Sequence, residues 1–333
     1  MNDFIPPSPA LGHPQLPPVA FDPEVAAVLA GMPPAPPLTR DTLPRDGVAT
    51  LFPSNDEVIA GRPIEWTEHL VQRKEGLPDI EVTVYRPCGH VSTELPAIYN
   101  IHGGGMIVGH RSWETARVVD LVDALGIVGV SVEYRLAPEY PFPAGVEDCY
   151  AGFVWLIDNA AELGVDPERV VVMGGSAGGG LAAAVALLAR DRSGPRMAGQ
   201  GLLCPMLDNT NTTVSSLQYD GIGTWQRDAN LLAWSCVLGD DLAYRPTAPA
   251  AAAPARAADL SGLPPAYIEV GAAELFRDED VAYASRIWAT GGQAELHVWA
   301  GGAHGFDMYM PDAALTHAAL AARSSWLRRV LGV

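Results

Sequence analysis

The chain has 333 residues, of which 48% are hydrophobic and 18% charged, a composition typical of a globular protein and not of a disordered or coiled-coil one. The formal net charge is −18, and an acidic surface repels phosphate backbones and anionic lipids, so we expect neither nucleic acid nor a membrane as partner. The first 18 residues lack a secretory pattern, and no apolar segment reaches the ~18 residues that span a bilayer. The four cysteines show no zinc-type spacing, which favours free thiols in a cytoplasmic protein and predicts no metal site.

The predicted elements begin with a proline-rich segment, residues 1–50, which contains one short helical pattern at 22–30. We expect this segment to lie over another part of the molecule as an N-terminal cap. From residue 80 onward, short apolar strand patterns alternate with helical patterns, which predicts an α/β fold with a mostly parallel central sheet and helices on both faces. The expected strands are 81–86, which alternates like a half-exposed strand, 97–101, 127–132, 170–173, 200–204, 266–270 and 294–299. The expected helices are 113–125, 145–163, 181–190, 280–289 and 313–330.

One interval interrupts this alternation. Residues 207–264 contain Trp225, Trp234 and a low-complexity Ala/Pro run at 247–258. We interpret the interval as a cap insertion within a catalytic domain that spans residues 51–333. The Ala/Pro run itself is predicted to be a solvent-exposed connection.

The strongest motif is Gly174-Gly175-Ser176-Ala177-Gly178, which lies between an expected strand and an expected helix. A serine on such a sharp turn exposes its hydroxyl, and the residues two before and two after it approach so closely that only glycine fits. A phosphate-binding loop would end in Gly-Lys-Ser/Thr or open as G-x-G-x-x-G, and neither pattern is present. The motif predicts that Ser176 is a catalytic nucleophile.

A second motif, His102-Gly103-Gly104-Gly105, follows the expected strand at 97–101. Consecutive glycines leave backbone N–H groups bare, and N–H donors fixed in advance stabilise the negative oxygen that develops when an acyl group is attacked. We interpret the motif as an oxyanion loop. His102 precedes the loop and is expected to hold its shape, not to act as the catalytic base.

A serine nucleophile needs a base, and His304 follows the last expected strand, where the chain order nucleophile, acid, base places it. The acid that orients the imidazole should follow the strand at 266–270. The candidates are Glu274, Asp278, Glu279 and Asp280. Spacing from the strand end favours Glu274, because the other three open a helix, where acids are common for electrostatic reasons; Asp278 is the next alternative.

With these motifs in place, the chain resembles the bacterial hormone-sensitive-lipase-like esterases (family IV) over about residues 80–330. Besides the two glycine motifs and His304-Gly305-Phe306, the likeness rests on Glu133-Tyr134-Arg135-Leu136-Ala137-Pro138-Glu139 and Phe142-Pro143-Ala144. Within that family the chain is most similar to the heroin-esterase type, through Pro205-Met206-Leu207-Asp208 and Trp225-Gln226-Arg227-Asp228-Ala229-Asn230.

The resemblance implies the α/β-hydrolase fold, a helical cap and an oxyanion hole formed by Gly104, Gly105 and Ala177. It also implies structural roles for Arg135 and Glu139. The chain departs from the family pattern at four positions: Gly175 replaces a frequent acid, Gly180 an asparagine, Met106 an aromatic residue, and Glu274 an aspartate.

Together these features predict a serine carboxylesterase that works through a Ser-His-Glu triad and an acyl-enzyme, without metal or cofactor. Met106, Trp225 and the aromatic residues of the cap favour an apolar pocket for small-molecule esters of the short-acyl, aryl or lactone type. Two alternatives stay open: a non-catalytic ligand-binding protein on the same scaffold, and an amidase, peptidase or acyltransferase with the same triad. A homodimer formed through an edge strand is also left open.

Overall fold

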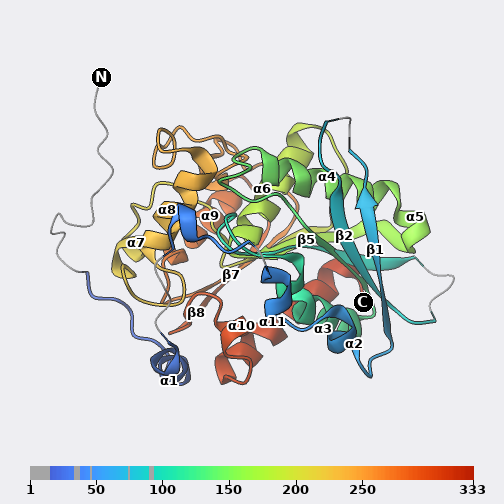
Figure 1. Ribbon diagram of the computed structural model, residues 1–333, viewed down its shortest axis with the longest axis horizontal. Coiled ribbons are helices and arrows are strands. Elements are labelled where there is room, and N and C mark those ends of the chain that lie inside the picture. Colours follow the sequence, from blue (N-terminus) through green and yellow to red (C-terminus); the bar gives the residue numbers. More distant parts are fainter. Residues whose placement is uncertain (1–15, 34–37, 46, 74–75, 90–93) are drawn as a thin grey trace.

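A single eight-stranded sheet forms the centre of the computed structural model, which describes residues 16–33, 38–45, 47–73, 76–89 and 94–333 (Figure 1). The strand order is β1-β2-β4-β3-β5-β6-β7-β8. β1 pairs antiparallel with β2 and β2 with β4, whereas the pairs from β4 to β8 are all parallel. The predicted α/β fold with a mostly parallel sheet is confirmed.

The strands are β1 (Ile64–Val71), β2 (Ile80–Pro87), β3 (Leu95–Ile101), β4 (Val128–Val132), β5 (Val165–Gly175), β6 (Gly199–Leu203), β7 (Ala266–Gly271) and β8 (Ala294–Trp299). The α-helices are α1 (Pro23–Gly31), α2 (Asn55–Ile59), α3 (Thr115–Leu125), α4 (Ala144–Asp158), α5 (Ala160–Leu163), α6 (Ala177–Asp191), α7 (Val214–Gln218), α8 (Arg227–Leu238), α9 (Arg277–Ala289), α10 (Phe306–Tyr309) and α11 (Ala314–Leu331). Short 3-10 turns complete the chain.

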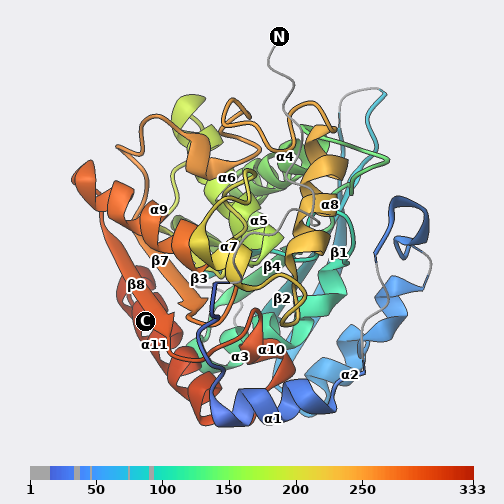
Figure 2. The same ribbon diagram turned by 90° about the vertical axis from the view of Figure 1, so that its left-hand side faces the viewer.

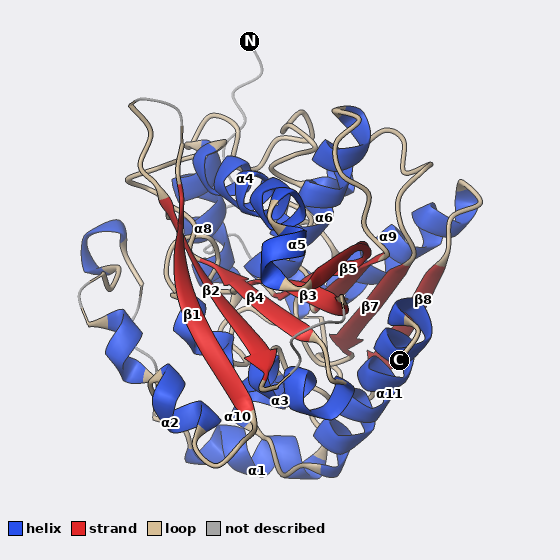
Figure 3. Ribbon diagram, turned by 90° about the vertical axis from the view of Figure 1, so that its right-hand side faces the viewer, coloured by secondary structure: helices blue, strands red, loops and turns tan. Residues whose placement is uncertain are grey.

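Helices cover both faces of the sheet, as Figure 3 shows. On one face α4, α6 and α9 pack against the strands, and on the other α3 and α11 do so. The central strands are apolar on both sides because both faces are covered; all five residues of β4 are buried. Each face therefore has its own hydrophobic core, and the sheet between them is held rigidly.

β2 is more buried than its alternating sequence predicts. Val82 and Val84 face the core beneath α4, and Tyr85 faces the core beneath α3. Thr83 is also buried, and its hydroxyl accepts a hydrogen bond from Arg111 Nε at 2.9 Å. The prediction of a half-exposed strand was wrong because β1, which the sequence patterns did not reveal, pairs with β2 and makes it an interior strand.

The Ala/Pro run at 247–258 is not a solvent-exposed connection, and that prediction was wrong as well. Ala252, Ala253 and Ala257 are buried. Small methyl side chains let this irregular segment pack closely against the core that contains α6. The Arg286 guanidinium of α9 donates to the backbone carbonyls of Ala255 and Ala257, which satisfies polar groups that the packing removes from water.

The N-terminal segment contacts two regions far away in the sequence. α1 packs through Val25 against α10 and α11 (Figure 2). Farther along, Arg40 donates to Ser235 in α8 and pairs with Asp240 at 2.7 Å. The segment thus touches the insertion that carries α7 and α8, although the role of the two as a cap remains a prediction.

Candidate active site

The strands β5, β6, β7 and β8 run parallel, so the residues that follow them emerge at one edge of the sheet. Ser176 directly follows β5, Cys204 directly follows β6, Glu274 lies three residues beyond β7, and His304 lies five residues beyond β8. The carboxyl edge of a parallel sheet is the usual location of a functional site in open α/β folds. Here it brings together four side chains that are far apart in sequence.

Ser176 sits on a strained turn between β5 and α6. Its backbone angles are φ 57° and ψ −121°, a conformation that residues other than glycine rarely adopt. The turn requires glycine on both sides: a Cβ on Gly178 would lie 1.9 Å from the Ile101 carbonyl oxygen, and one on Gly174 would lie 2.4 Å from the Gly178 carbonyl carbon. The sequence therefore forces the serine hydroxyl outward at the end of the strand.

His304 connects Ser176 to an acid through two hydrogen bonds. Its Nε2 lies 2.9 Å from Ser176 Oγ, and its Nδ1 lies 2.6 Å from Glu274 Oε2. Glu274 Oε1 accepts a second hydrogen bond, from the Gly271 backbone amide at 3.2 Å. The alternative acid, Asp278, instead accepts from the Ser215 amide at 2.7 Å.

Burial and charge act in opposite directions on His304, which is only 8% exposed. Burial lowers the pKa of the imidazole, but the charge and hydrogen bond of Glu274 outweigh it and raise the pKa above 6.5. The acid therefore stabilises the imidazolium that forms if the ring takes a proton from Ser176. This arrangement can activate a hydroxyl nucleophile.

The loop of Gly103, Gly104 and Gly105 lies against the serine. A Cβ on Gly103 would be 3.5 Å from the Cβ of Ser176, and one on Gly104, where φ is 108°, would lie 2.1 Å from the Val108 carbonyl oxygen. The loop closes on itself through a 2.9 Å hydrogen bond from the Val108 amide to the Gly104 carbonyl. Glycines are therefore required here by space as well as by conformation.

His102 supports this loop from within the core. The ring is fully buried, its Nδ1 lies 2.8 Å from the Gly103 carbonyl oxygen, and it stacks on Tyr134 with 4.2 Å between ring centroids. Burial lowers the pKa of His102 to about 3, so the ring is neutral. It lies on the loop as a support, in agreement with the sequence interpretation.

Residues of the insertion contact both the glycine loop and the base. The Trp225 ring lies so close to Gly105 that a Cβ there would be 2.7 Å from it. The neighbouring Thr224 hydroxyl donates to the His304 carbonyl at 2.5 Å. Met106, at φ 60°, is buried and lines a small apolar cavity together with Leu181, Val237 and other residues. The structure thus brings both predicted pocket residues next to the glycine loop.

Comparisons with known proteins agree on one family. Residues 98–308 match the family model described as alpha/beta hydrolase fold. The chain is 41% identical over 233 residues to Carboxylesterase NlhH of Mycobacterium tuberculosis, covering 67% of this chain and 69% of that protein. It is 33% identical to an Arylesterase of Saccharolobus solfataricus over 226 residues, 64% of this chain and 68% of that one. Among solved structures, Bacterial Heroin Esterase superposes with a TM-score of 0.84 at 34% identity, covering 94% of this chain and 98% of that one.

The chain belongs to the α/β-hydrolase fold family. Within it, the chain is a serine carboxylesterase of the hormone-sensitive-lipase-like group, as its motifs predicted. Among the helices of the described residues, none is long and apolar enough to cross a bilayer.

In this α/β-hydrolase, a buried charge network lies beneath the site and was not evident from the sequence. Glu114 accepts from the Gly103 amide at 3.2 Å and pairs with Arg117 at 2.9 Å. Arg117 contacts Asp307 at 3.3 Å, and Asp307 in turn pairs with Arg323 of α11 at 2.7 Å. Burial would raise the pKa of Asp307, but the two arginines lower it to about 2. The network joins the glycine loop to the segment that follows His304.

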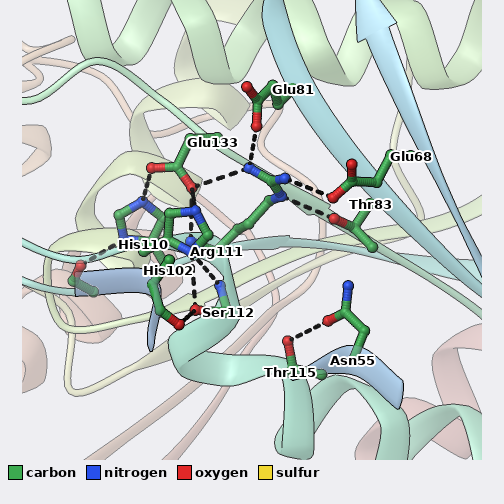
Figure 4. A network of polar contacts seen from close by, with 12 residues as sticks. Asn55, Glu68, Glu81, Thr83, His102, His110, Arg111, Ser112, Thr115 and Glu133 are labelled. Carbon is green, nitrogen blue, oxygen red and sulfur yellow. Dashed lines mark hydrogen bonds and ion pairs between the residues drawn. The ribbon is translucent and has the colours of Figure 1, made fainter. Parts of the chain in front are cut away.

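A second polar cluster surrounds Arg111 on the side of the glycine loop nearest β1 and β2 (Figure 4). Arg111 pairs with Glu81 at 2.6 Å and Glu68 at 2.9 Å, and its backbone amide donates to Glu133 at 2.8 Å. Glu133 lies 3.7 Å from the Nε2 of His102. Burial, opposed by Arg111, raises the pKa of Glu133 to about 7. The cluster therefore contains a carboxyl group that titrates near neutrality.

Cys204 is a third feature that the sequence analysis missed, since the cysteines were interpreted only as structural thiols. Burial and the nearby charge of Glu274 raise the pKa of the Cys204 thiol well above its ordinary value. Its sulfur lies with Glu274 and His304 in the one group of potential metal ligands found among the described residues. The available signal was its position directly after β6, at the same edge as Ser176.

Proposed function

We propose that Ser176, His304 and Glu274 form the catalytic triad of this carboxylesterase. The observation that carries the proposal is the unbroken pair of hydrogen bonds from Ser176 through His304 to Glu274, at 2.9 and 2.6 Å. His304 accepts the Ser176 proton as the hydroxyl attacks the ester carbonyl, and then protonates the leaving alcohol. Water repeats these steps on the acyl-enzyme and releases the acid.

The backbone amides of Gly104, Gly105 and Ala177 are proposed to hold the oxyanion. Ala177 is the first residue of α6, where an N–H has no partner within the helix. None of the three amides donates to a backbone or side-chain acceptor within the described part of the chain. Amides that are free and held rigidly suit an oxygen whose negative charge develops only during the reaction.

The substrates are proposed to be small esters with a short acyl group and an aryl or lactone-type alcohol portion. The apolar side chains of Met106 and Trp225 beside the glycine loop support a compact apolar substrate. The relative named Arylesterase supports an aromatic alcohol. The free cysteines support a cytoplasmic location.

The triad is tested by the Ser176→Ala variant with p-nitrophenyl acetate as substrate. We expect kcat to fall by about 10⁶-fold, as for nucleophile removal in other serine hydrolases. Ser285→Ala, which removes an exposed hydroxyl from α9, is the matched control and should retain wild-type turnover. Hydrolysis by Ser176→Ala at the wild-type rate would show that another group is the nucleophile.

The substrate proposal is tested with p-nitrophenyl esters whose acyl chains increase from two to sixteen carbons. We expect kcat/KM to be highest at six carbons or fewer, because Met106 and Trp225 crowd the glycine loop and leave little room for a long acyl chain. A maximum at twelve carbons or more would contradict the short-acyl proposal. Comparison of each ester with its matching anilide distinguishes an esterase from an amidase in the same assay.

A further inference from the structure

The side chain of Cys204 lies against the proposed acid and base. Its sulfur, a carboxylate oxygen of Glu274 and a ring nitrogen of His304 all lie within 4.8 Å of one another. Cys204 is half-buried, whereas Glu274 and His304 are buried. Three side chains of different chemistry thus converge from three different strand ends.

A further acidic side chain stands nearby without a partner. Asp280 of α9 is fully buried, and neither of its carboxylate oxygens has a hydrogen-bond partner among the described residues. Its charge interacts with those of Glu274 and Cys204. Buried polar groups normally have partners, and an unpaired buried carboxyl group costs free energy unless a positive charge compensates it. Burial raises the pKa of Asp280 well above its ordinary value and holds the carboxyl group neutral, and a cation bound nearby would favour its ionised form.

We propose that Cys204, Glu274 and His304 form a Zn²⁺ site that holds the enzyme in an inactive state, an inference that rests on the proposed roles of Glu274 and His304. Thiolate sulfur, imidazole nitrogen and carboxylate oxygen are the ligands that Zn²⁺ takes, at about 2.0–2.3 Å. Ligand atoms at those distances from one ion are roughly 3–4 Å apart. One adjustment needed is the opening of the 2.6 Å contact between His304 Nδ1 and Glu274 Oε2. Mg²⁺ and Ca²⁺ prefer oxygen ligands alone, so they fit this set poorly.

Zn²⁺ inhibits by changing which nitrogen of His304 carries the proton. In the active arrangement Nδ1–H donates to Glu274, and the Nε2 lone pair is free to accept the Ser176 proton. When Nδ1 gives its lone pair to the ion, the neutral ring must carry its single proton on Nε2. The Cys204 thiol releases its proton to solvent, the ring proton moves from Nδ1 to Nε2 by exchange with solvent, and Ser176 keeps its own. The ring then donates to Ser176 and cannot act as its base.

The first test measures inhibition. Zn²⁺ is titrated into the wild-type enzyme in a buffer without chelating groups, p-nitrophenyl acetate hydrolysis is followed, and EDTA is then added. We expect activity to be lost and then restored by EDTA. Cys204→Ala, measured against its own rate without metal, should require at least about tenfold more Zn²⁺ for half-inhibition, because one of three ligands is removed. Cys88→Ala, which removes an exposed thiol, should keep wild-type sensitivity.

The second test measures binding without activity, in the Ser176→Ala protein. Calorimetry with Zn²⁺ should show one ion per chain, with affinity at least about tenfold weaker when Cys204→Ala is added. Titration with Cd²⁺ should produce the ultraviolet charge-transfer absorption of a cadmium–thiolate bond, and the double variant should lack it. Because these readouts do not need hydrolysis, a failure of the metal site is distinguishable from a failure of the proposed triad.

Two results would overturn the proposal. One is equal sensitivity of the wild-type and Cys204→Ala enzymes to Zn²⁺, which would place any inhibitory ion elsewhere. The other is the absence of Zn²⁺ binding by the Ser176→Ala protein, whether or not the wild-type enzyme hydrolyses esters.

Discussion

The acid beside His304 is a glutamate, and both of its oxygens are engaged. Oε2 contacts the imidazole at 2.6 Å, and Oε1 accepts the Gly271 amide at 3.2 Å. Gly271 is the last residue of β7, so the carboxylate is tied back to the strand from which its loop departs. The extra methylene of a glutamate is accommodated because the side chain folds back to this anchor, and the carboxylate is then fixed in direction.

Glu274→Gln is expected to lower kcat by about 10³- to 10⁴-fold, because an amide does not stabilise the imidazolium and permits the wrong ring tautomer. The residual activity should also respond differently to pH. His304 must be neutral to act as a base, and Glu274 raises its pKa, so the acidic limb of kcat/KM in the wild-type enzyme lies above pH 6.5. Without that charge, the effect of burial dominates and the limb moves to lower pH.

The matched control for this prediction is Asp278→Asn, which alters the alternative acid. Its carboxylate faces the Ser215 amide, so we expect only a small change in kcat and no displacement of the pH profile. A large loss in Asp278→Asn together with near-normal turnover in Glu274→Gln would show that the acid has been assigned to the wrong residue.

At the scale of single residues, those that obey strict local rules could be predicted from the sequence. Ser176 and His304 were found because a glycine-flanked turn and a position after the last strand leave few choices. Glu274 was favoured by spacing, and the structure brings it to the imidazole at 2.6 Å. No local motif marked Cys204 or Asp307 as part of the site. The surroundings of Cys204 depend on how distant strand ends meet, and those of Asp307 depend on where α11 packs.

Elements were predictable where their pattern was periodic or continuously apolar. β4 was located within one residue, whereas β5 and α6 begin five and four residues before the predicted ranges 170–173 and 181–190. β1 was missed because Ile64–Val71 carries polar residues on its exposed face and lies at the sheet edge, where burial does not impose an apolar run. The sequence analysis did not predict α7 and α8 as separate helices within the insertion. The residues that each helix buries are set by contacts with distant segments, so neither helix shows a clear apolar pattern. The buried Ala/Pro run shows that low complexity does not imply contact with solvent.

At the end of β4, Glu133 gives the cluster around Arg111 a measurable response to pH. Its pKa is raised from 4.5 to about 7 in the folded state, so this group contributes stability below pH 4.5 that is lost as the pH rises to about 7. The free energy of unfolding of the wild type, relative to Glu133→Gln, should therefore fall by up to about 3 kcal/mol between pH 4.5 and 8.

The measurement is urea unfolding of both proteins in the same buffers at several pH values. The difference between the two curves removes the contribution of groups remote from Glu133, and it reports Glu133 together with its coupling to neighbours such as His110, 3.4 Å away. A difference that does not vary with pH would show that folding does not raise the pKa of Glu133.

Across the whole molecule, the buried charge network joins the glycine loop, the segment after His304 and α11. Arg323 is 1% exposed and pairs with both Asp307 and Glu269. Such a network does not arise from any one motif, because its members come from α3, β7, α10 and α11. It couples the geometry of the site to the docking of the last helix.

Arg323→Met should lower the free energy of unfolding by about 3–5 kcal/mol, because the substitution leaves buried Glu269 without a cation and leaves Asp307 with Arg117 alone. Arg329→Met is the control on the same helix. Arg329 pairs with Glu295 at the surface, so its loss should cost about 1 kcal/mol or less. Thermal unfolding of the two variants beside the wild type provides the comparison, and equal losses would mean that the buried network contributes no more than a surface pair.

Arg45, in the N-terminal segment, donates to the carbonyls of Ile107 at 2.5 Å and Ala137 at 2.8 Å and pairs with Glu139. Ile107 itself belongs to the turn that closes on Gly104. The N-terminal segment is therefore part of the scaffold of the glycine loop. Exchange of N-terminal segments between related enzymes, for example to change substrate range, would therefore also disturb the glycine loop and the rate of the chemical step. To avoid this, the new segment must carry an arginine that reaches the same carbonyls and Glu139.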